Sequence, residues 1–337
     1  MLKKFLALTI CSVLVVPLVQ ANEVNLYSAR KEALIKPVLD QFSAQSGIKV
    51  NLITGDADAL ISRIANEGKF SPADMLVTTD VGRLVRAKEL GLLQAVQSEE
   101  IERQVPTHLR DADQQWIALT IRARPIMYAP ERVDVKQLTT MEELTDARFK
   151  GRICVRSSSN IYNQSMVSAM IEQLGEENTL NWAKGLVANF ARPPKGGDRD
   201  QIKAVAAGQC DIAIANTYYL AGMLNSADSQ EVEAANKVKV LWPNQGDRGT
   251  HINISGAGIT RHAPNKANAQ ALLDFMLSKE AQAWYAEHNG EYPLRSDVEQ
   301  SDVLKSFGEF KAENIPLDKV GAQNATALKL MDKAGWK

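Results

Sequence analysis

The tyrosines are the residues of this chain whose types and spacing first suggest chemistry. Two of the 7 tyrosines are adjacent, Tyr218 and Tyr219, and they follow a mostly apolar run, Cys210 to Ala215, that is typical of a strand. Asn216 or Thr217 would then cap a helix that begins at the pair. Neighbouring residues of a helix lie about 100° apart, so both hydroxyl groups can converge on one point. That point lies at the carboxyl end of a strand, where open α/β sheets bind ligands.

Tyr162 extends this pattern to the preceding β–α unit. It follows the polar loop Ser157 to Asn160 and stands where the next helix would begin. Three tyrosines at two such loops favour a binding site, but all three could instead be core aromatics whose hydroxyl ends reach solvent. The residues alone leave both interpretations open.

Basic residues near the predicted loops suggest a second kind of site. Arg30, Arg122, Arg124 and Arg199 could bind an anion, or they could form ordinary surface ion pairs. The segment Gly196 to Asp200 (GGDRD) has two interpretations as well. It could be a glycine turn that offers backbone N–H groups to an anion, or a helix start that is capped by its own acidic residues.

Motifs of enzymes are missing from the sequence. It has no G-x-S-x-G elbow, no GxxxxGK[ST] phosphate loop and no HExxH zinc helix. The 4 histidines do not have the spacing of metal ligands: His108, His251, His262 and His288. We therefore expect a binding protein and not an enzyme.

Length and composition describe an ordinary globular chain. Its 337 residues suggest about two domains, and 45% hydrophobic with 23% charged residues excludes disorder, collagen and coiled coil. Lys and Arg number 39 against 40 Asp and Glu, a balance that argues against a nucleic-acid binder.

The N-terminus has the layout of a secretory signal peptide. Lys3 and Lys4 precede an apolar run, Phe5 to Val19, and a V-x-A cleavage box ends at Ala21. We expect residues 1–21 to be removed after Ala21 and the mature chain to be soluble in the periplasm, with no membrane span.

Export would leave two cysteines in the mature chain, Cys154 and Cys210. An oxidising compartment permits a disulfide between them, which we predict. Two buried free thiols are the alternative.

Hydrophobic periodicity predicts two α/β lobes. In the first, strands at 23–28, 48–53 and 74–78 alternate with helices at 31–45, 58–68 and 81–90. A long β-rich stretch at 115–128 would pass from this lobe into a second unit, which contains strands at 151–155 and 210–215. We expect two mainly parallel sheets joined by strand hinges, the architecture of a protein that closes around a ligand.

The predicted domain division follows from the passage of the 115–128 stretch between the two lobes. The first lobe would cover 22–120 and be completed by about 248–292, and the second would cover 121–247 and be completed by about 293–337.

Over nearly the whole mature chain, the sequence resembles the periplasmic ferric-ion-binding proteins of bacterial ABC importers, the bacterial transferrins. The adjacent tyrosines in their context are the most specific part of this similarity. Further matching segments are Val24 to Ser28, Ser71 to Asp74, Arg122 to Arg124, Cys154 to Ser157, Tyr162-Asn163, Gly196 to Asp200, Asn216 to Tyr219 and Asn253 to Gly256.

The resemblance implies a type II periplasmic-binding fold with Fe³⁺ in the cleft between the lobes. Matching positions make Tyr162, Tyr218 and Tyr219 the expected iron ligands. Some members of the family add a His or a further Tyr from the loop after the first strand, but here that loop continues Arg30-Lys31-Glu32. The departure implies the subgroup that uses three tyrosines and a synergistic anion such as carbonate or bicarbonate. Arg30 and Arg122 are its expected partners, and either Glu32 or water would fill a remaining position.

The chemistry of the ion agrees with such a ligand set. Fe³⁺ prefers anionic oxygen donors, and a bound metal ion can deprotonate tyrosine although its ordinary pKa is near 10. Three phenolates would neutralise three positive charges, and arginine would balance the anion. The resemblance also implies an inner-membrane ABC permease and its ATPase as partners, and a monomeric carrier. The alternative is a periplasmic binding protein for an organic or inorganic anion without metal.

Overall fold

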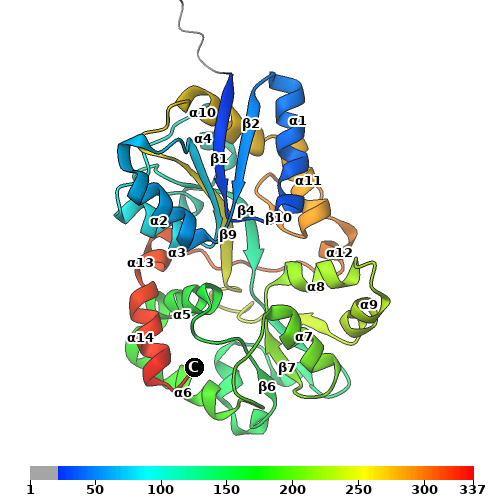
Figure 1. Ribbon diagram of the computed structural model, residues 1–337. Coiled ribbons are helices and arrows are strands. Elements are labelled where there is room, and N and C mark those ends of the chain that lie inside the picture. Colours follow the sequence, from blue (N-terminus) through cyan, green and yellow to red (C-terminus); the bar gives the residue numbers. More distant parts are fainter. Residues whose placement is uncertain (1–21) are drawn as a thin grey trace, which may run out of the picture.

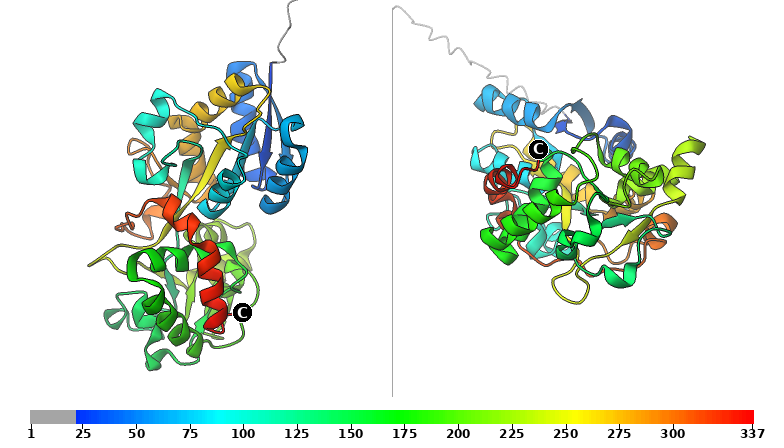
Figure 2. Two further views of the ribbon diagram at one scale, coloured as in Figure 1. Left: turned by 90° about the vertical axis from the view of Figure 1, so that its left-hand side faces the viewer. Right: turned by 90° about the horizontal axis from the view of Figure 1, so that it is seen from below.

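The computed structural model describes residues 22–337. The predicted signal peptide and its cleavage after Ala21 lie outside the described residues. Two lobes stand one above the other, each a sheet with helices packed against it, and strands run from one lobe into the other (Figure 1). The view turned about the vertical axis shows the same division, with the C-terminal helix lying against the lower lobe (Figure 2, left). No helix in residues 22–337 has the length and apolar character that a membrane crossing needs.

The first lobe is built on a sheet that, in the described chain, has six strands in the order β10–β4–β9–β3–β1–β2. Its strands are β1 Glu23–Ser28, β2 Lys49–Thr54, β3 Met75–Thr79, β4 Ile117–Ala123, β9 Ile252–Ile259 and β10 Tyr292–Pro293. Its helices are α1 Lys36–Ser46, α2 Ala57–Glu67, α3 Val81–Glu89, α4 Glu99–Gln104, α10 Lys266–Met276, α11 Lys279–Asn289 and α12 Asp302–Lys305.

The second lobe is built on a sheet with the order β6–β7–β5–β8. Its strands are β5 Ile126–Tyr128, β6 Ile153–Cys154, β7 Ile212–Ile214 and β8 Lys239–Leu241. The remaining helices are α5 Ile161–Leu174, α6 Glu176–Ala188, α7 Asp198–Ala206, α8 Thr217–Leu224, α9 Ser229–Asn236, α13 Leu317–Ala322 and α14 Asn324–Lys333. Short 3-10 helices occur at Glu32–Leu34, Gly68–Phe70, Thr107–Leu109, Val135–Gln137, Glu142–Thr145 and Ala147–Phe149.

Both sheets are mixed: most strands of each sheet run in one direction, as expected, and β9, β10 and β5 run against them. β1 pairs in parallel with β2 and β3, but β9 runs antiparallel to β3 and β4, and β5 runs antiparallel to β7 and β8. The reason lies in the crossings between lobes. A strand that belongs to a β–α unit ends at the edge of its sheet that faces the other lobe. A strand that enters from the other lobe, such as β9 or β5, begins at that edge and therefore runs in the opposite direction. The two lobes and their strand hinges are as predicted.

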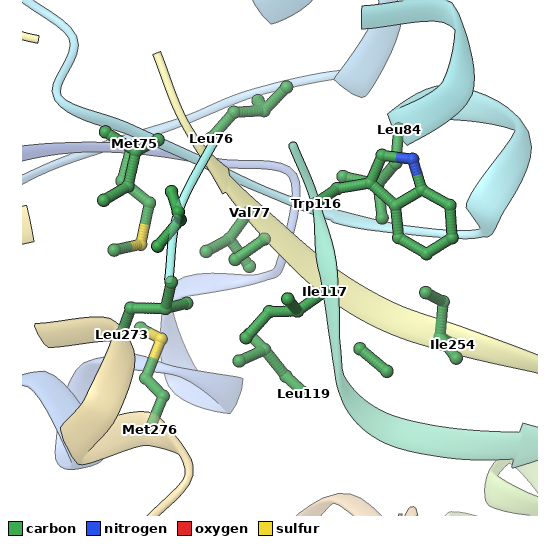
Figure 3. Packing of buried hydrophobic residues seen from close by; sticks show 14 of the residues in the cluster. Met75, Leu76, Val77, Leu84, Trp116, Ile117, Leu119, Ile254, Leu273 and Met276 are labelled. Carbon is green, nitrogen blue, oxygen red and sulfur yellow. The ribbon is translucent and has the colours of Figure 1, made fainter. Parts of the chain in front are cut away.

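The core of the first lobe is formed between the central strands and the covering helices (Figure 3). Met75, Leu76 and Val77 of β3 are all fully buried, which is typical of a strand covered on both faces. Side chains from β4, β9 and α10 pack around them, and Trp116 closes the cluster next to Leu84 of α3. This apolar burial supplies the main driving force for folding of the lobe.

The C-terminal segment joins the second lobe later than predicted. Leu304, Leu317 and Val320 pack with the core of the first lobe. The second core instead receives Ala327, Leu330 and Met331 of α14 together with Trp336 near the chain end. The core contacts therefore place Leu304, Leu317 and Val320 with the first lobe and α14 with the second.

The predicted disulfide is present in the structure. Cys154 at the end of β6 is bonded to Cys210, with a Cα–Cα separation of 5.9 Å. Both cysteines are buried in a cluster of the second lobe that also contains Ile202 and Leu220. The bridge therefore ties strand β6 to the start of the β7 segment, close to the loops that carry the tyrosines.

Candidate metal centre

A cleft of about 460 Å³ lies between the two lobes. Residues of both lobes line it, including Arg30, Thr79, Arg122 and Glu291 from the first and Tyr162, Tyr218 and Tyr219 from the second. The structure thus brings together the three predicted tyrosine ligands and the two predicted anion partners, but not Glu32.

The topology of the second sheet explains why the three tyrosines meet. β6 and β7 are parallel neighbours, with Cys154 opposite Ala213, so the loops that follow them leave at the same edge of the sheet. α5 begins in the first loop, where the Asn160 side chain caps the backbone N–H of Tyr162 at 3.2 Å. α8 begins in the second loop. The tyrosines are therefore placed by the starts of two helices, as the sequence indicates.

The adjacent tyrosines lie side by side in the cleft wall. The ring centroids of Tyr218 and Tyr219 are 4.3 Å apart, and Asn216 donates a hydrogen bond from Nδ2 to the Tyr218 hydroxyl at 3.3 Å. Both side chains are only partly buried. Both residues also line the cleft, so they are not aromatics of the closed core alone.

Thr79 links the first lobe to the tyrosine of α5. Its Oγ1 atom lies 3.4 Å from the hydroxyl of Tyr162. Thr79 ends β3, so it occupies the carboxyl edge of a parallel pair of strands. Sequence reasoning missed this residue, although a threonine directly after an apolar strand in a predicted parallel sheet was a usable signal.

Arg122 of β4 is the charged group nearest the tyrosine rings. Its guanidinium carbon lies 4.1 Å from the ring centroid of Tyr218 and 5.0 Å from that of Tyr162. The side chain is buried, and its Nε atom has no hydrogen-bond partner among the described residues. A buried guanidinium at this distance favours the ionised form of both phenols.

The three phenols differ in acidity because they differ in burial and in their neighbours. Burial opposes ionisation of Tyr162, but the charge of Arg122, together with contacts to Thr79 and Tyr218, lowers its pKa to about 8. Burial raises the pKa of Tyr218 well above its usual value, and Arg122 offsets only part of that shift. Burial and the neighbouring Tyr162 also raise the pKa of Tyr219.

Arg30 forms a buried ion pair that sequence reasoning did not find. Its Nη2 atom lies 3.1 Å from Oε1 of Glu291, and Nη1 donates to Oε2 at 3.1 Å and to Ser255 Oγ at 2.7 Å. Glu291 also accepts a hydrogen bond from Thr120 and lies 3.7 Å from Nε of Arg122. Desolvation opposes ionisation of Glu291, yet the two arginines and their hydrogen bonds hold its pKa below the usual value. No local signal reveals this carboxylate, because 261 residues separate it from Arg30.

The remaining candidates have other roles. Glu32 is exposed in a 3-10 helix and does not line the cleft, whereas its neighbour Lys31 does. Gly197 donates its backbone N–H to Asp200 at 2.6 Å, so the glycine turn is an acid-capped helix start. Arg199 lines the cleft and pairs with Glu231 at 2.7 Å.

Three tyrosine oxygens are the donors that the second lobe offers to a metal ion, and Glu287, His288 and Glu291 of the first lobe also line the cleft. Within residues 22–337, no group of three or more His, Cys, Asp and Glu side chains could hold a metal ion. Three phenols, a buried arginine and an arginine–carboxylate pair suit a hard, highly charged cation together with an anion.

Comparison with known proteins identifies the family of this chain. The family profile of the bacterial extracellular solute-binding proteins matches residues 70–312. The chain belongs to this family. Iron uptake protein A1 of Synechocystis is 48% identical over 318 residues, which cover 94% of this chain and 88% of that protein.

Solved structures show the same two-lobed architecture. IdiA (FutA) of Trichodesmium in complex with iron and citrate has a TM-score of 0.91 and 47% identity, and the match covers 94% of this chain and all of that one. The ferric binding protein of Campylobacter jejuni has a TM-score of 0.89 and 41% identity over 93% of this chain and all of that one. The resemblance to ferric-ion-binding proteins is confirmed, and so is the two-lobed periplasmic-binding-protein fold.

Proposed function

We propose that this solute-binding protein captures ferric iron in its cleft, with Tyr162, Tyr218 and Tyr219 as phenolate ligands. One observation carries the proposal: three tyrosines from the starts of two helices line one cleft, and Arg122 lies against the rings of two of them. Iron would load onto the second lobe, which supplies all three tyrosines. The first lobe would then close over it with Arg30, Arg122 and Thr79.

A synergistic anion beside Arg30 and Arg122 completes the proposed site. Three phenolates neutralise Fe³⁺, while two arginines and Glu291 leave one positive charge. A singly charged anion such as bicarbonate would balance that charge, with water at any coordination position left over. The cleft of about 460 Å³ also has room for a larger carboxylate, and the Trichodesmium protein was solved with iron and citrate. The arginine pair therefore fits the general class of small oxyanions.

The proposed biological role is delivery of iron to an inner-membrane ABC permease and its ATPase. The chain would be exported, cleaved after Ala21 and active in the periplasm as a monomeric carrier, with binding and release as its function and not catalysis. Mass spectrometry of the exported protein should find Asn22 as the first residue. An intact N-terminus in the exported pool would contradict the proposed processing.

Metal analysis and a visible spectrum of the purified mature protein test the proposal. Phenolate–Fe³⁺ complexes absorb visible light, so one bound iron per chain should give a coloured protein. Because each ligand loses a proton on binding, the affinity for iron should fall steeply as the pH drops. A colourless protein that binds an anion but no iron would support the alternative, a binding protein for an organic or inorganic anion.

A further inference from the structure

The side chain of Arg124 connects the two loops that carry the tyrosines. Arg124 lies between β4 and β5, where the chain enters the second lobe, and is 2% exposed. Its Nη2 atom donates to Oδ1 of Asn163 at 2.6 Å, and Nη1 donates to Oδ1 of Asn216 at 2.9 Å. Asn163 directly follows Tyr162, and Asn216 lies two residues before Tyr218. One guanidinium therefore holds both helix starts.

Both asparagines use their side chains for this connection. Asn216 occupies the N-cap position of α8, where an asparagine ordinarily bonds to the first turn of its helix, yet its side chain makes no capping hydrogen bond. It bonds instead to Arg124 and to the Tyr218 hydroxyl. Asn163 donates from Nδ2 to the carbonyl oxygens of Arg156 and Ser157, at 3.0 and 3.1 Å, and so orders the loop before Tyr162.

A buried aspartate completes the network. Oδ2 of Asp198 accepts from Nη1 of Arg124 at 2.9 Å and from the backbone N–H of Asn216 at 2.9 Å. Arg156 lies 3.4 Å from the other carboxylate oxygen. Asp198 is fully buried, so the charge of Arg124 is compensated inside the lobe. A planar guanidinium presents its donors in a rigid fork, a geometry that the compact ammonium group of lysine does not reproduce.

We propose that Arg124 is a positioning residue that fixes the separation between the Tyr162 phenolate and those of Tyr218 and Tyr219. This inference rests on the proposed function. Arg124 does not line the cleft and acts on the tyrosine loops through Asn163, Asn216 and Asp198. A metal ion bound by oxygens from two loops needs both loops held in place, since a functional site must keep its groups within about 0.5 Å of the working geometry.

Two substitutions at Arg124 test this role in the mature full-length protein. Arg124→Lys keeps the charge next to Asp198 but loses the two-nitrogen fork that reaches both asparagines, and Arg124→Gln removes the charge as well. Both should shift the visible absorption band of the ferric protein. Both should also weaken iron binding, measured by competition with citrate, by about 10- to 100-fold, as is usual for outer-sphere partners of metal ligands.

Leu186→Ala is the matched control for a general loss of stability. Leu186 is fully buried in the core of the same lobe, belongs to α6 and does not line the cleft. This variant should unfold at a lower temperature while its absorption band and iron affinity stay at the wild-type values. If the Arg124 variants do not fold, Asn163→Ala removes one arm of the bridge and should shift the band in the same way.

The wild-type spectrum separates a failure of the positioning role from a failure of the proposed function. If the wild-type protein binds iron with a visible band and both Arg124 variants, or Asn163→Ala in their place, keep that band and affinity, the positioning role is wrong. If the wild-type protein itself shows neither iron nor a band, the proposed function fails first.

Discussion

Arg122, a residue of the first lobe, lies with its guanidinium carbon 4.1 Å from the ring centroid of Tyr218 in the second lobe. The same group lies 5.0 Å from the ring of Tyr162. A single buried cation therefore touches two proposed iron ligands across the cleft. When these phenols lose their protons, the attraction between them and Arg122 becomes stronger, so ligand ionisation and lobe closure favour each other.

Tyr162 should be the first of the three cleft tyrosines to ionise in the metal-free protein. Arg122 helps to lower its pKa to about 8 against burial, whereas burial raises the pKa of Tyr218. A spectrophotometric titration should therefore show a phenol that ionises near pH 8, and Tyr162→Phe should abolish that step. An unchanged titration curve in the variant would contradict the assignment.

The same pKa shift predicts how stability depends on pH. The pKa of Tyr162 is about 8 when folded and about 10 when unfolded. Its ionisation therefore contributes stability that is fully present above about pH 10 and is lost as the pH falls through about 8. The free energy of unfolding of the wild type, relative to that of Tyr162→Phe, should rise across this window. A constant difference between the two proteins would speak against the shift.

Glu291→Gln should make iron binding less dependent on added bicarbonate. The change leaves Arg30 and Arg122 without their carboxylate, so an anion is attracted more strongly. The metal-free variant should also lose about 3 kcal/mol of stability, as expected when one partner of a buried ion pair is removed. Glu313→Gln is the control, because Glu313 is an equally buried carboxylate that pairs with His251 away from the cleft. The same bicarbonate dependence in wild type and Glu291→Gln would argue against this role.

Replacing both Cys154 and Cys210 with serine should lower the free energy of unfolding by about 4 kcal/mol in the chain-entropy account of cross-links. Denaturant titration measures the loss. The absorption band of bound iron should not change, because neither cysteine lines the cleft. Thiol titration of the denatured, unreduced wild type should find no reactive thiol, and two such thiols would disprove the bridge in the exported protein.

Gly290→Ala should weaken closure of the lobes. Gly290 has φ +61°, and an added Cβ would lie 2.9 Å from Cβ of Ala221 in α8 of the opposite lobe. Scattering should find the iron-loaded variant less compact than the wild type, and iron should leave it faster. Gly308→Ala is the control, since its φ of +78° carries a similar backbone penalty while its nearest neighbour is 4.0 Å away. Equal compactness of all three proteins would rule out this contact as a limit on closure.

Local pattern was sufficient to predict the elements that carry the tyrosines. β1 begins and ends where alternation places it, and α5 and α8 each begin within a residue of the predicted start, because an asparagine occupies the N-cap position before a largely apolar run in both cases. The three ligand candidates then follow from two loops that leave the same edge of one sheet.

What the sequence could not reveal depends on contacts between distant segments. Strand direction is not encoded locally, so the antiparallel β9 between β3 and β4 was not foreseen. Glu291 looks like any acidic loop residue until the fold buries it against Arg30. Arg124 resembled a surface arginine, yet it forms the central contact of a buried network.

Iron stoichiometry and the visible spectrum of Tyr218→Phe combined with Tyr219→Phe test the central claim most directly. The double variant keeps both rings in the cleft wall but removes two donor oxygens. It should remain folded while it loses the visible band and most of its iron. Tyr128→Phe, which changes a tyrosine of β5 outside the cleft, should keep both. If the double variant binds iron with wild-type stoichiometry and colour, these tyrosines are not the ligands and the account of the site is wrong.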